Sequence, residues 1–357
     1  MQIQFFRGNK PLITLEDIAR KAGVSHSTVS RALADSSLVN EETKERIQLL
    51  AKEFGYQVNQ VARNLKTRST QTIGLIVPEV LNPYYPKLIQ RVADLVRESG
   101  YSLQLHLSGS HQESEATCIS NLRENRADGI LLVTAENGLV ARDQVNALVS
   151  AGIPIVLMGW VENADHIDLV TGDDAKGGAE LAKHLINFGH TKIAIVGKQA
   201  HRGKFDRVFG FLDSIQTAGL TVPDEMVVEA ENDDEVLTGV QALLSLPEPP
   251  TAIFAYQDSL AASVYKHLSN AGISIPDEMT VVGFDDIDLA SFLSPQLTTV
   301  GGHIEPLATE FVKLLIDRIR NQNEGHEPMH IIAVPKVIVR SSSAPPRITV
   351  LAKQIAT

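Results

Sequence analysis

The spacing of hydrophobic residues divides the chain into a short helical head and a longer body. Up to about residue 57, apolar residues recur three or four positions apart, which is the spacing of amphipathic helices. From residue 72 onward, short β-branched runs alternate with amphipathic stretches. This pattern predicts parallel sheets covered by helices. The expected strands are residues 73–77, 102–106, 129–133, 154–158, 192–196, 252–255 and 280–284.

The head has the start and stop signals of three short helices. Thr14, followed three residues later by an acid, predicts the start of the first helix. Gly23 permits a tight turn, and Ser25 caps a second helix. A third helix is expected between Asn40, its cap, and Gly55, which ends it. Two short helices joined by a tight turn indicate a helix-turn-helix.

The body contains an internal repeat. The run at residues 72–77 resembles the run at 192–196, and two further strand pairs, 129–133 with 252–255 and 153–156 with 279–282, have a similar offset. The repeat predicts two similar lobes. Two doubly wound lobes that face one another leave a cleft at the carboxyl ends of their strands, where a ligand is expected.

Composition and charge limit the possible functions of the 357-residue chain. Its net charge is −11, but residues 1–70 hold eleven Lys and Arg against seven Asp and Glu, so the head carries +4 and the remainder −15. A basic head is suited to phosphates. The single cysteine, Cys118, excludes an intramolecular disulfide and a Cys-rich zinc site. Neither a membrane span nor a secretory signal is visible, so we expect a cytoplasmic location.

Two segments of the head carry a family resemblance. Residues 14–31, TLEDIARKAGVSHSTVSR, resemble the head of the lactose/galactose repressor (LacI/GalR) family, as do Phe54-Gly55-Tyr56 and the residues that follow. The resemblance implies a DNA-binding transcriptional regulator, expected to be a repressor of carbohydrate use controlled by a small carbohydrate or sugar acid. Its partners would be a pseudo-palindromic operator in double-stranded DNA, the effector and a second copy of the chain.

The second helix is expected to read the operator. In such a motif the first residues of this helix enter the major groove, where each base pair shows a distinct pattern of donors and acceptors. His26 and Ser27 would then read bases, and Arg31 would reach a guanine edge or a phosphate. The resemblance adds five residues with short hydroxyl groups as DNA contacts: Thr14, Ser25, Thr28, Ser30 and Thr43. Ala34 stands where family members often have Asn, so one polar contact is missing.

Residues 59–67 resemble the hinge helix of the family. The resemblance implies that two hinges pack together in the minor groove with Leu65 wedged between base steps, and that Asn59 and Ala62 also contact DNA. A segment of this length is too short to be stable as an isolated helix, so its ordering can act as a switch. Val58 replaces the Pro that often precedes the hinge in the family, which predicts a less rigid entry.

The expected domains follow from these segments. Residues 1–57 form the DNA-binding domain and 58–71 the hinge and linker, and 72–339 form the domain that binds the effector and dimerises. The Ser- and Pro-rich residues 340–357 are predicted to be disordered, and their apolar positions are too few for a tetramerising coil, so we expect a homodimer.

The resemblance extends into the body through residues 170–178, 184–190 and 282–299. It implies a periplasmic-binding-protein-like α/β domain in which the chain crosses between lobes near residues 170, 300 and 328. Arg207 and Asp285 match the family residues that grip the effector in the cleft. A guanidinium and a carboxylate suit vicinal hydroxyl groups. Further candidates for effector contacts are Tyr84, Tyr85, Trp160 and Gln257.

Two glycine positions in the body have specific interpretations. Gly159 stands where several sugar- or purine-binding relatives have Asp, which suggests a larger or more acidic ligand. Gly177 and Gly178 are expected to allow close packing of helices rather than phosphate binding.

No nucleotide-binding glycine motif or known catalytic motif appears in the sequence. We therefore expect no enzyme activity, no cofactor and no metal site. Two alternatives remain open. One is a regulator of the same build that activates, or that responds to a nucleoside or a phosphoprotein co-repressor. The other is a solute-binding α/β protein whose helical head is incidental.

Overall fold

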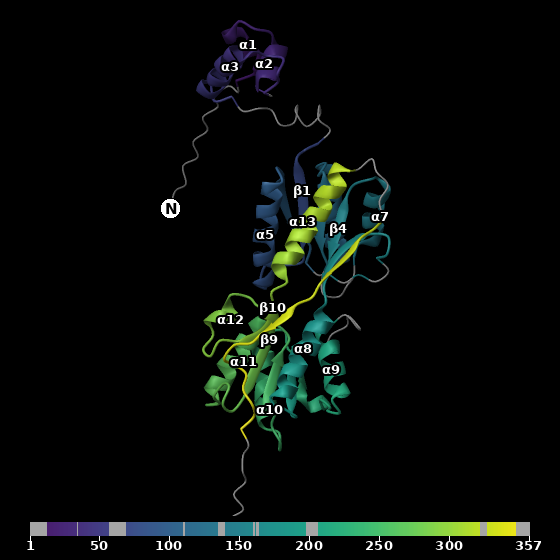
Figure 1. The fold of residues 1–357 in the computed structure, drawn as a ribbon, viewed down its shortest axis with the longest axis vertical. Coiled ribbons are helices and arrows are strands. Elements are labelled where there is room, and N and C mark those ends of the chain that lie inside the picture. Colours follow the sequence, from purple (N-terminus) through teal and green to yellow (C-terminus); the bar gives the residue numbers. More distant parts are fainter. Residues whose placement is uncertain are drawn as a thin grey trace, which may run out of the picture. The chain divides into compact units, whose positions relative to one another are not determined.

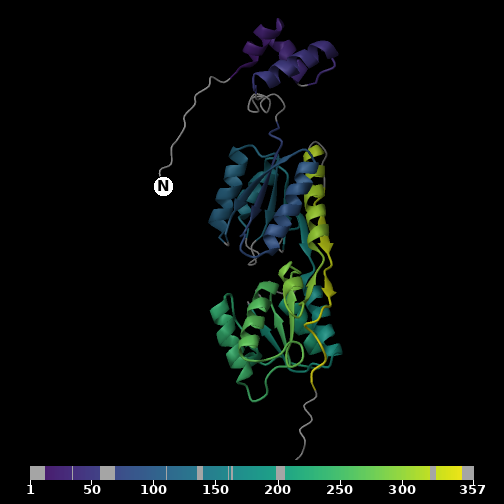
Figure 2. The same cartoon turned by 90° about the vertical axis from the view of Figure 1, so that its left-hand side faces the viewer.

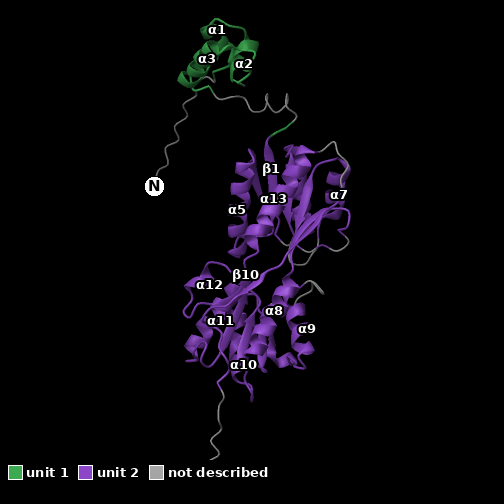
Figure 3. Cartoon of the chain, in the orientation of Figure 1, with its two compact units in different colours: residues 1–70 green, residues 71–357 purple. Residues whose placement is uncertain are grey.

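The computed structural model describes residues 13–33, 35–56, 69–109, 111–134, 140–159, 161, 164–197, 206–321 and 327–347. The chain divides into two compact units, residues 1–70 and 71–357, which Figure 3 shows in different colours. The predicted hinge segment, 59–67, lies outside the described residues.

The first unit contains the three predicted helices: α1 (Leu15–Ala22), α2 (His26–Leu33) and α3 (Glu41–Glu53) (Figure 1). Thr14 caps α1 in the predicted capping box, and Gly23, at φ +66°, makes the turn between α1 and α2. Ile18, Val29 and Ile47, one from each helix, are fully buried and form the centre of the core. The helix-turn-helix is therefore confirmed.

The second unit contains two six-stranded sheets, one in each lobe. The first sheet has the order β11-β5-β4-β3-β1-β2 and the second has the order β12-β10-β9-β8-β6-β7. The first sheet comprises β1 (Thr72–Val77), β2 (Ser102–Leu107), β3 (Gly129–Val133), β4 (Ile155–Met158), β5 (Asp168–Gly172) and β11 (His330–Ala333). The second comprises β6 (Ile193–Val196), β7 (Val227–Val228), β8 (Ala252–Ala255), β9 (Thr280–Phe284), β10 (Thr298–Gly301) and β12 (Lys336–Ile338).

The two sheets share one topology, which confirms the repeat that the sequence predicts. Read from one edge, β2-β1-β3-β4-β5-β11 corresponds to β7-β6-β8-β9-β10-β12. The predicted strand pairs, β1 with β6, β3 with β8 and β4 with β9, occupy equivalent places. Neighbouring strands are parallel, except that β12 runs antiparallel to β10.

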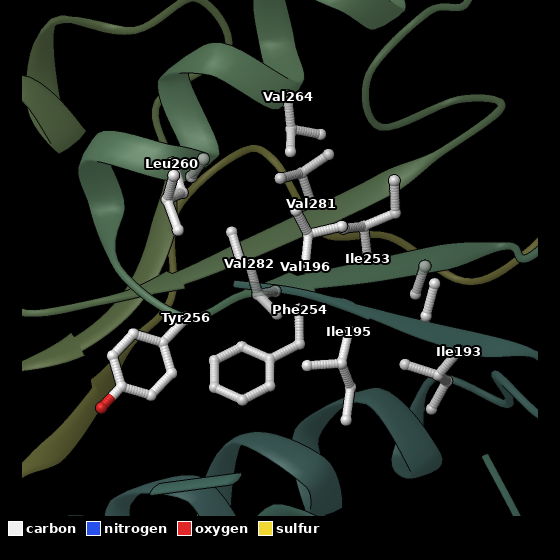
Figure 4. Close-up of a cluster of buried hydrophobic side chains, with 14 of the residues drawn as sticks. Ile193, Ile195, Val196, Ile253, Phe254, Tyr256, Leu260, Val264, Val281 and Val282 are labelled. Atoms are coloured by element: carbon white, nitrogen blue, oxygen red, sulfur yellow. The ribbon is translucent and has the colours of Figure 1, made fainter. Parts of the chain in front are cut away.

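Helices cover both faces of each sheet, as expected for doubly wound lobes. The helices of the first lobe are α5 (Tyr84–Glu98), α6 (Gln112–Glu124), α7 (Arg142–Ser150) and α13 (Ile304–Arg320). Those of the second are α8 (Asp174–Asn187), α9 (Arg207–Thr217), α10 (Asp233–Leu244), α11 (Asp258–Asn270), the short α12 (Leu289–Phe292) and a 3-10 turn at Asp224–Met226. Figure 4 shows the core of the second lobe, where Phe254 and Val282 of the sheet lie near Leu260 of α11.

The chain crosses between the lobes three times. It leaves the first sheet after β5, returns between β10 and α13, and crosses again between β11 and β12, close to the predicted positions. Figure 2 shows the yellow segment that carries β11 and β12 running from one lobe into the other. No helix in the part of the chain that the structure describes is long and apolar enough to cross a membrane.

The prediction of a disordered tail is wrong for residues 340–347. Ser342 is fully buried, its hydroxyl donates to the Val281 carbonyl at 2.6 Å, and it accepts from the Thr298 amide at 2.8 Å. The Ser- and Pro-rich composition predicted disorder, but here the short hydroxyls pair with buried backbone groups of β9 and β10. Residues 348–357 lie outside the described residues.

Candidate functional site

The start of α2 presents a cluster of hydroxyl groups. The Ser25 hydroxyl accepts from the Thr28 amide at 3.2 Å and lies 2.8 Å from the hydroxyls of both Ser27 and Thr28. His26 and Ser27 are exposed, as is Arg31 one helical turn further on. The N-terminus of a helix favours anions, so this end of α2 suits a DNA backbone while its exposed side chains are free to reach bases.

The other predicted DNA contacts in the head lie at the starts of α1 and α3 and on α2 itself. Thr14 is the exposed cap of α1, and Thr43 stands in the first turn of α3, where its amide donates to Asn40 at 2.8 Å. Ser30 is half-buried on α2. Asn59, Ala62 and Leu65 of the predicted hinge lie outside the described residues.

A cleft lies between the two lobes of the second unit, at the carboxyl ends of their strands. Its empty volume is about 760 Å³, which includes space open to solvent. Its lining residues are Asn82, Tyr84, Tyr85, Val133, Thr134, Met158, Gly159, Thr171, Gly172, Asp174, Arg207, Asp285, His303 and Leu307. Both lobes therefore contribute polar groups to one cavity.

Arg207 is the electrostatic centre of this cleft. Its guanidinium donates to Asp174 at 2.8 Å, to Asp285 at 3.0 Å and to the Tyr256 carbonyl at 2.9 Å. It also lies over the Phe284 ring, 3.8 Å from the centroid. Burial lowers the pKa of Arg207, but the carboxylates of Asp285 and Asp174 raise it well above the ordinary value. Arg207 is thus held as a cation in one orientation.

Two glycines place Arg207 opposite Asp174. A Cβ atom added at Gly178 of α8 would lie 1.9 Å from the Arg207 carbonyl oxygen, and one added at Gly210 of α9 would lie 1.9 Å from the Ala175 carbonyl oxygen. The two helices therefore cross with their backbones in contact. This confirms the predicted role in close helix packing for Gly178 and brings the first residues of α8 and α9 together, whereas Gly177 faces the side chains of Phe284, Pro335 and Val300.

Asp285 stands in a strained loop. Its φ is +105° and that of Asp286 is +52°, both unusual for residues other than glycine. The fully buried Asp258 holds this loop: it accepts from the Ile287 amide at 3.0 Å and from the Thr299 hydroxyl at 2.6 Å. Burial, followed by the charge of Asp285, raises the pKa of Asp258 to about 8.

Two nitrogen atoms in the cleft have no hydrogen-bond partner among the described residues: Nε of Arg207 and Nδ1 of His303. Burial lowers the pKa of His303, so its imidazole is neutral at pH 7. Buried polar atoms without partners are uncommon in folded proteins. Both atoms are therefore available to a polar molecule in the cavity.

The remaining predicted effector contacts differ in whether they line the cleft. Tyr84 and Tyr85 line the cleft, with ring centroids 5.5 Å apart and an edge-to-face angle of 86°. Gln257 is not among the lining residues, and its side chain accepts from the Asn82 amide at 3.0 Å, which joins the two lobes. Trp160 lies outside the described residues.

Sequence reasoning missed several polar lining residues, notably Asp174, His303, Asn82 and Thr134. One signal was available, because Thr134 and Asp174 follow strand ends just as Asp285 does. His303 follows a strand end too, but its burial depends on the crossing from β10 to α13. Among the described residues, no group of three or more His, Cys, Asp or Glu could hold a metal ion.

Family comparisons match both units. Residues 14–59 match the bacterial regulatory proteins of the lacI family, and residues 182–343 match the periplasmic binding protein-like domain. The repressor PurR of Vibrio cholerae (strain ATCC 39315) and the ribose operon repressor of Haemophilus influenzae are each 31% identical to the chain over 93% of its length and 98% of theirs. These relatives are regulators, which agrees with the expectation that the chain is not an enzyme.

Solved structures show the same fold. The transcriptional regulator CelR in complex with cellobiose has a TM-score of 0.68 and 28% identity, over 93% of this chain and 100% of that one. The lac repressor dimer bound to operator has a TM-score of 0.82 and 21% identity, over 93% and 99%. The chain belongs to the lacI family of bacterial regulatory proteins and is a DNA-binding transcriptional repressor.

Proposed function

We propose that the chain is a dimeric repressor whose cleft binds a neutral, hydroxyl-rich small molecule of the carbohydrate class. The observation that carries this proposal is the cluster of Arg207, Asp174 and Asp285 in a cavity between two lobes. Carboxylate oxygens accept from vicinal hydroxyls, and the unpaired Nε of Arg207 can donate to a hydroxyl oxygen. The similarity to a ribose operon repressor and to the regulator CelR in complex with cellobiose supports a ligand of the carbohydrate class.

The charge balance of the cleft favours a neutral ligand over an acidic one. Among its lining residues, Arg207 is opposed by two carboxylates, and His303 is neutral at pH 7. An anion entering the site would therefore meet a net negative charge in a partly desolvated space. This argues against the acidic ligand that Gly159 suggested. A purine-like ligand is the alternative, since the relatives include PurR.

A thermal-shift series on the full chain tests the ligand class. The probes are D-ribose, cellobiose, gluconate and hypoxanthine. A ligand at 100 times its Kd adds about 2.7 kcal/mol of stability to the state it binds. We expect stabilisation by a neutral sugar and none by gluconate. A response to hypoxanthine alone would replace the carbohydrate with the purine alternative.

On the DNA side, we propose that two heads bind a pseudo-palindromic operator through His26, Ser27 and Arg31, with the hinge segment 59–67 in the minor groove. Two-fold symmetric DNA is expected for a two-fold symmetric dimer. Large apolar side chains support a dimer surface on the second unit, because Leu81 is 87% exposed and Phe292 79% exposed. A cytoplasmic location belongs to the same proposal.

Selection from a random duplex library tests this part. We expect the bound sequences to have two-fold symmetry, and Phe292→Glu to convert the dimer into monomers that bind them poorly. Recovery of asymmetric sites by a monomeric chain would contradict the proposal. Leu65→Ala is expected to weaken operator binding and leave binding of the sugar unchanged.

A further inference from the structure

His303 occupies an unusual place in the fold. It stands between β10 and α13, where the chain crosses from the second lobe back to the first. Its side chain lines the cleft, yet the residue is only 3% exposed. Its Nδ1 atom has no hydrogen-bond partner among the described residues. A buried polar atom that gave up its water and gained no partner reduces the stability of the fold.

Another buried histidine shows how this chain satisfies an imidazole for structural purposes. His190 is 1% exposed, and its Nδ1 lies 2.8 Å from the Thr251 hydroxyl while its Nε2 lies 2.9 Å from the Ala344 carbonyl. An unpaired nitrogen alone is not diagnostic, because Nδ1 of His267 also lacks a partner, outside the cleft. The combination of an unpaired nitrogen and a place in the cavity wall distinguishes His303.

We infer that His303 is a specificity-determining residue of the cleft, whose neutral imidazole exchanges a hydrogen bond with a hydroxyl group of the bound molecule. This rests on the proposed function, since it concerns the same cavity. The Tyr84 ring lies 6.3 Å from the imidazole, centroid to centroid, at 33°. A Cβ atom added at Gly172 would lie 3.5 Å from the Cδ2 atom of the ring. A neutral imidazole can donate with one nitrogen and accept with the other, as a hydroxyl group can.

The surrounding charges make this contact depend on pH. Asp174 at the start of α8, Arg207 at the start of α9, Asp286 after β9 and Tyr84 on α5 face the imidazole or act on its charge. Burial, aided by Arg207, lowers the pKa of His303, and Asp174, the Gly301 backbone and Asp286 oppose this only in part. The neutral form is therefore favoured at pH 7, and affinity that depends on it is lost as the pH falls below the ordinary histidine range, about 6.5.

The first test compares thermal stability of the unliganded full-length chain. His303→Leu removes the unpaired nitrogen, and we expect a Tm equal to or above that of the original chain. His190→Leu is the matched control, and we expect it to lower the Tm by at least about 2 °C because two satisfied hydrogen bonds are lost. A drop for His303→Leu as large as that of the control would overturn the inference, since it would show a structural role.

The second test measures the affinity for D-ribose at pH 7.5 and pH 5.5. We expect His303→Leu to weaken binding at least tenfold at pH 7.5, and His303→Gln, whose amide can both donate and accept, to restore most of it. Binding by the original chain should weaken at pH 5.5, and binding by the Gln variant should change less. Equal affinity of all three proteins contradicts the inference. If the original chain does not bind D-ribose, the proposal of a ribose-like effector is wrong. The Tm comparison then still decides the role of His303.

Discussion

The guanidinium of Arg207 and the carboxylate of Asp285 lie 3.0 Å apart although 78 positions separate them in the chain. Asp174, 33 positions before Arg207, completes the arrangement at 2.8 Å. The three residues come from the starts of two helices and the end of a strand, so they meet only when the second lobe is folded. The pair is largely buried and lines the cleft, so we expect substitutions there to affect stability and ligand binding together.

Arg207→Lys tests whether the planar guanidinium group is needed for stability and sugar binding. A lysine keeps the charge but cannot hold two carboxylates in fixed directions. We expect lower stability and at least a tenfold loss of sugar affinity, about 1.4 kcal/mol. Arg318→Lys is the control, because the guanidinium of Arg318 also holds carboxylate oxygens with two donors, those of Asp168, away from the cleft. It should lower the Tm while leaving affinity intact, and a loss of affinity in both variants would refute a specific role for Arg207.

Gly178→Ala tests the close crossing of α8 and α9. The added methyl group would lie 1.9 Å from the Arg207 carbonyl oxygen, part of the backbone, so the helices must separate. We expect a loss of about 1–3 kcal/mol of folding free energy, as for other overpacked cores, together with weaker sugar binding. Asp213→Ala, on the exposed side of α9, is the matched control. Urea unfolding of both variants measures the difference, and an unaffected Gly178 variant would mean that the helices tolerate separation.

Asp258→Asn tests the support beneath Asp285. Because the pKa of Asp258 is about 8, above its unfolded value, the folded protein holds a proton that the unfolded chain releases between about pH 4 and pH 8. The contribution of Asp258 to the stability of the fold is therefore largest at acid pH and is lost as the pH rises through its folded pKa of about 8. The Asn variant loses one acceptor, which lowers the free energy of unfolding by about 1 kcal/mol. Its stability should nevertheless fall less than that of the original chain as the pH rises. Urea midpoints from pH 5 to pH 9 measure this, and identical pH profiles would contradict it.

The helix caps, the repeat and the positions of Arg207 and Asp285 were predictable because each depends on local pattern or on a motif. The burial of Ser342 was not predictable, because a Ser- and Pro-rich stretch has the composition of a disordered tail whether or not its hydroxyl groups find hydrogen-bond partners. Gln257 was expected at the ligand from the family resemblance, but its side-chain oxygen accepts from Asn82 of the other lobe. Contacts between lobes depend on how the two lobes are placed in space, which no single segment encodes.

Gly159→Asp tests why this chain lacks the acid that several relatives carry. Gly159 has φ +110°, and a Cβ atom there would lie 2.4 Å from the Thr134 hydroxyl oxygen. We expect destabilisation by about 1–3 kcal/mol from backbone strain alone, and little sugar binding. Adding Thr134→Ala should relieve the clash but not the strain, so the double variant should recover only part of the loss. Full recovery in thermal unfolding would show that Thr134 alone excludes a side chain.

Ser342→Ala tests the ordered tail. The hydroxyl of Ser342 joins the Val281 carbonyl to the Thr298 amide, so its removal leaves two buried backbone groups without this partner. Such losses cost about 1–3 kcal/mol for each unsatisfied group. The neighbouring Ser341 is exposed, and Ser341→Ala serves as the control. A lower Tm for the first variant alone is expected, and hydrogen exchange should show faster exchange at the Thr298 amide. If both variants unfold at the same temperature, the tail contributes nothing to the second lobe.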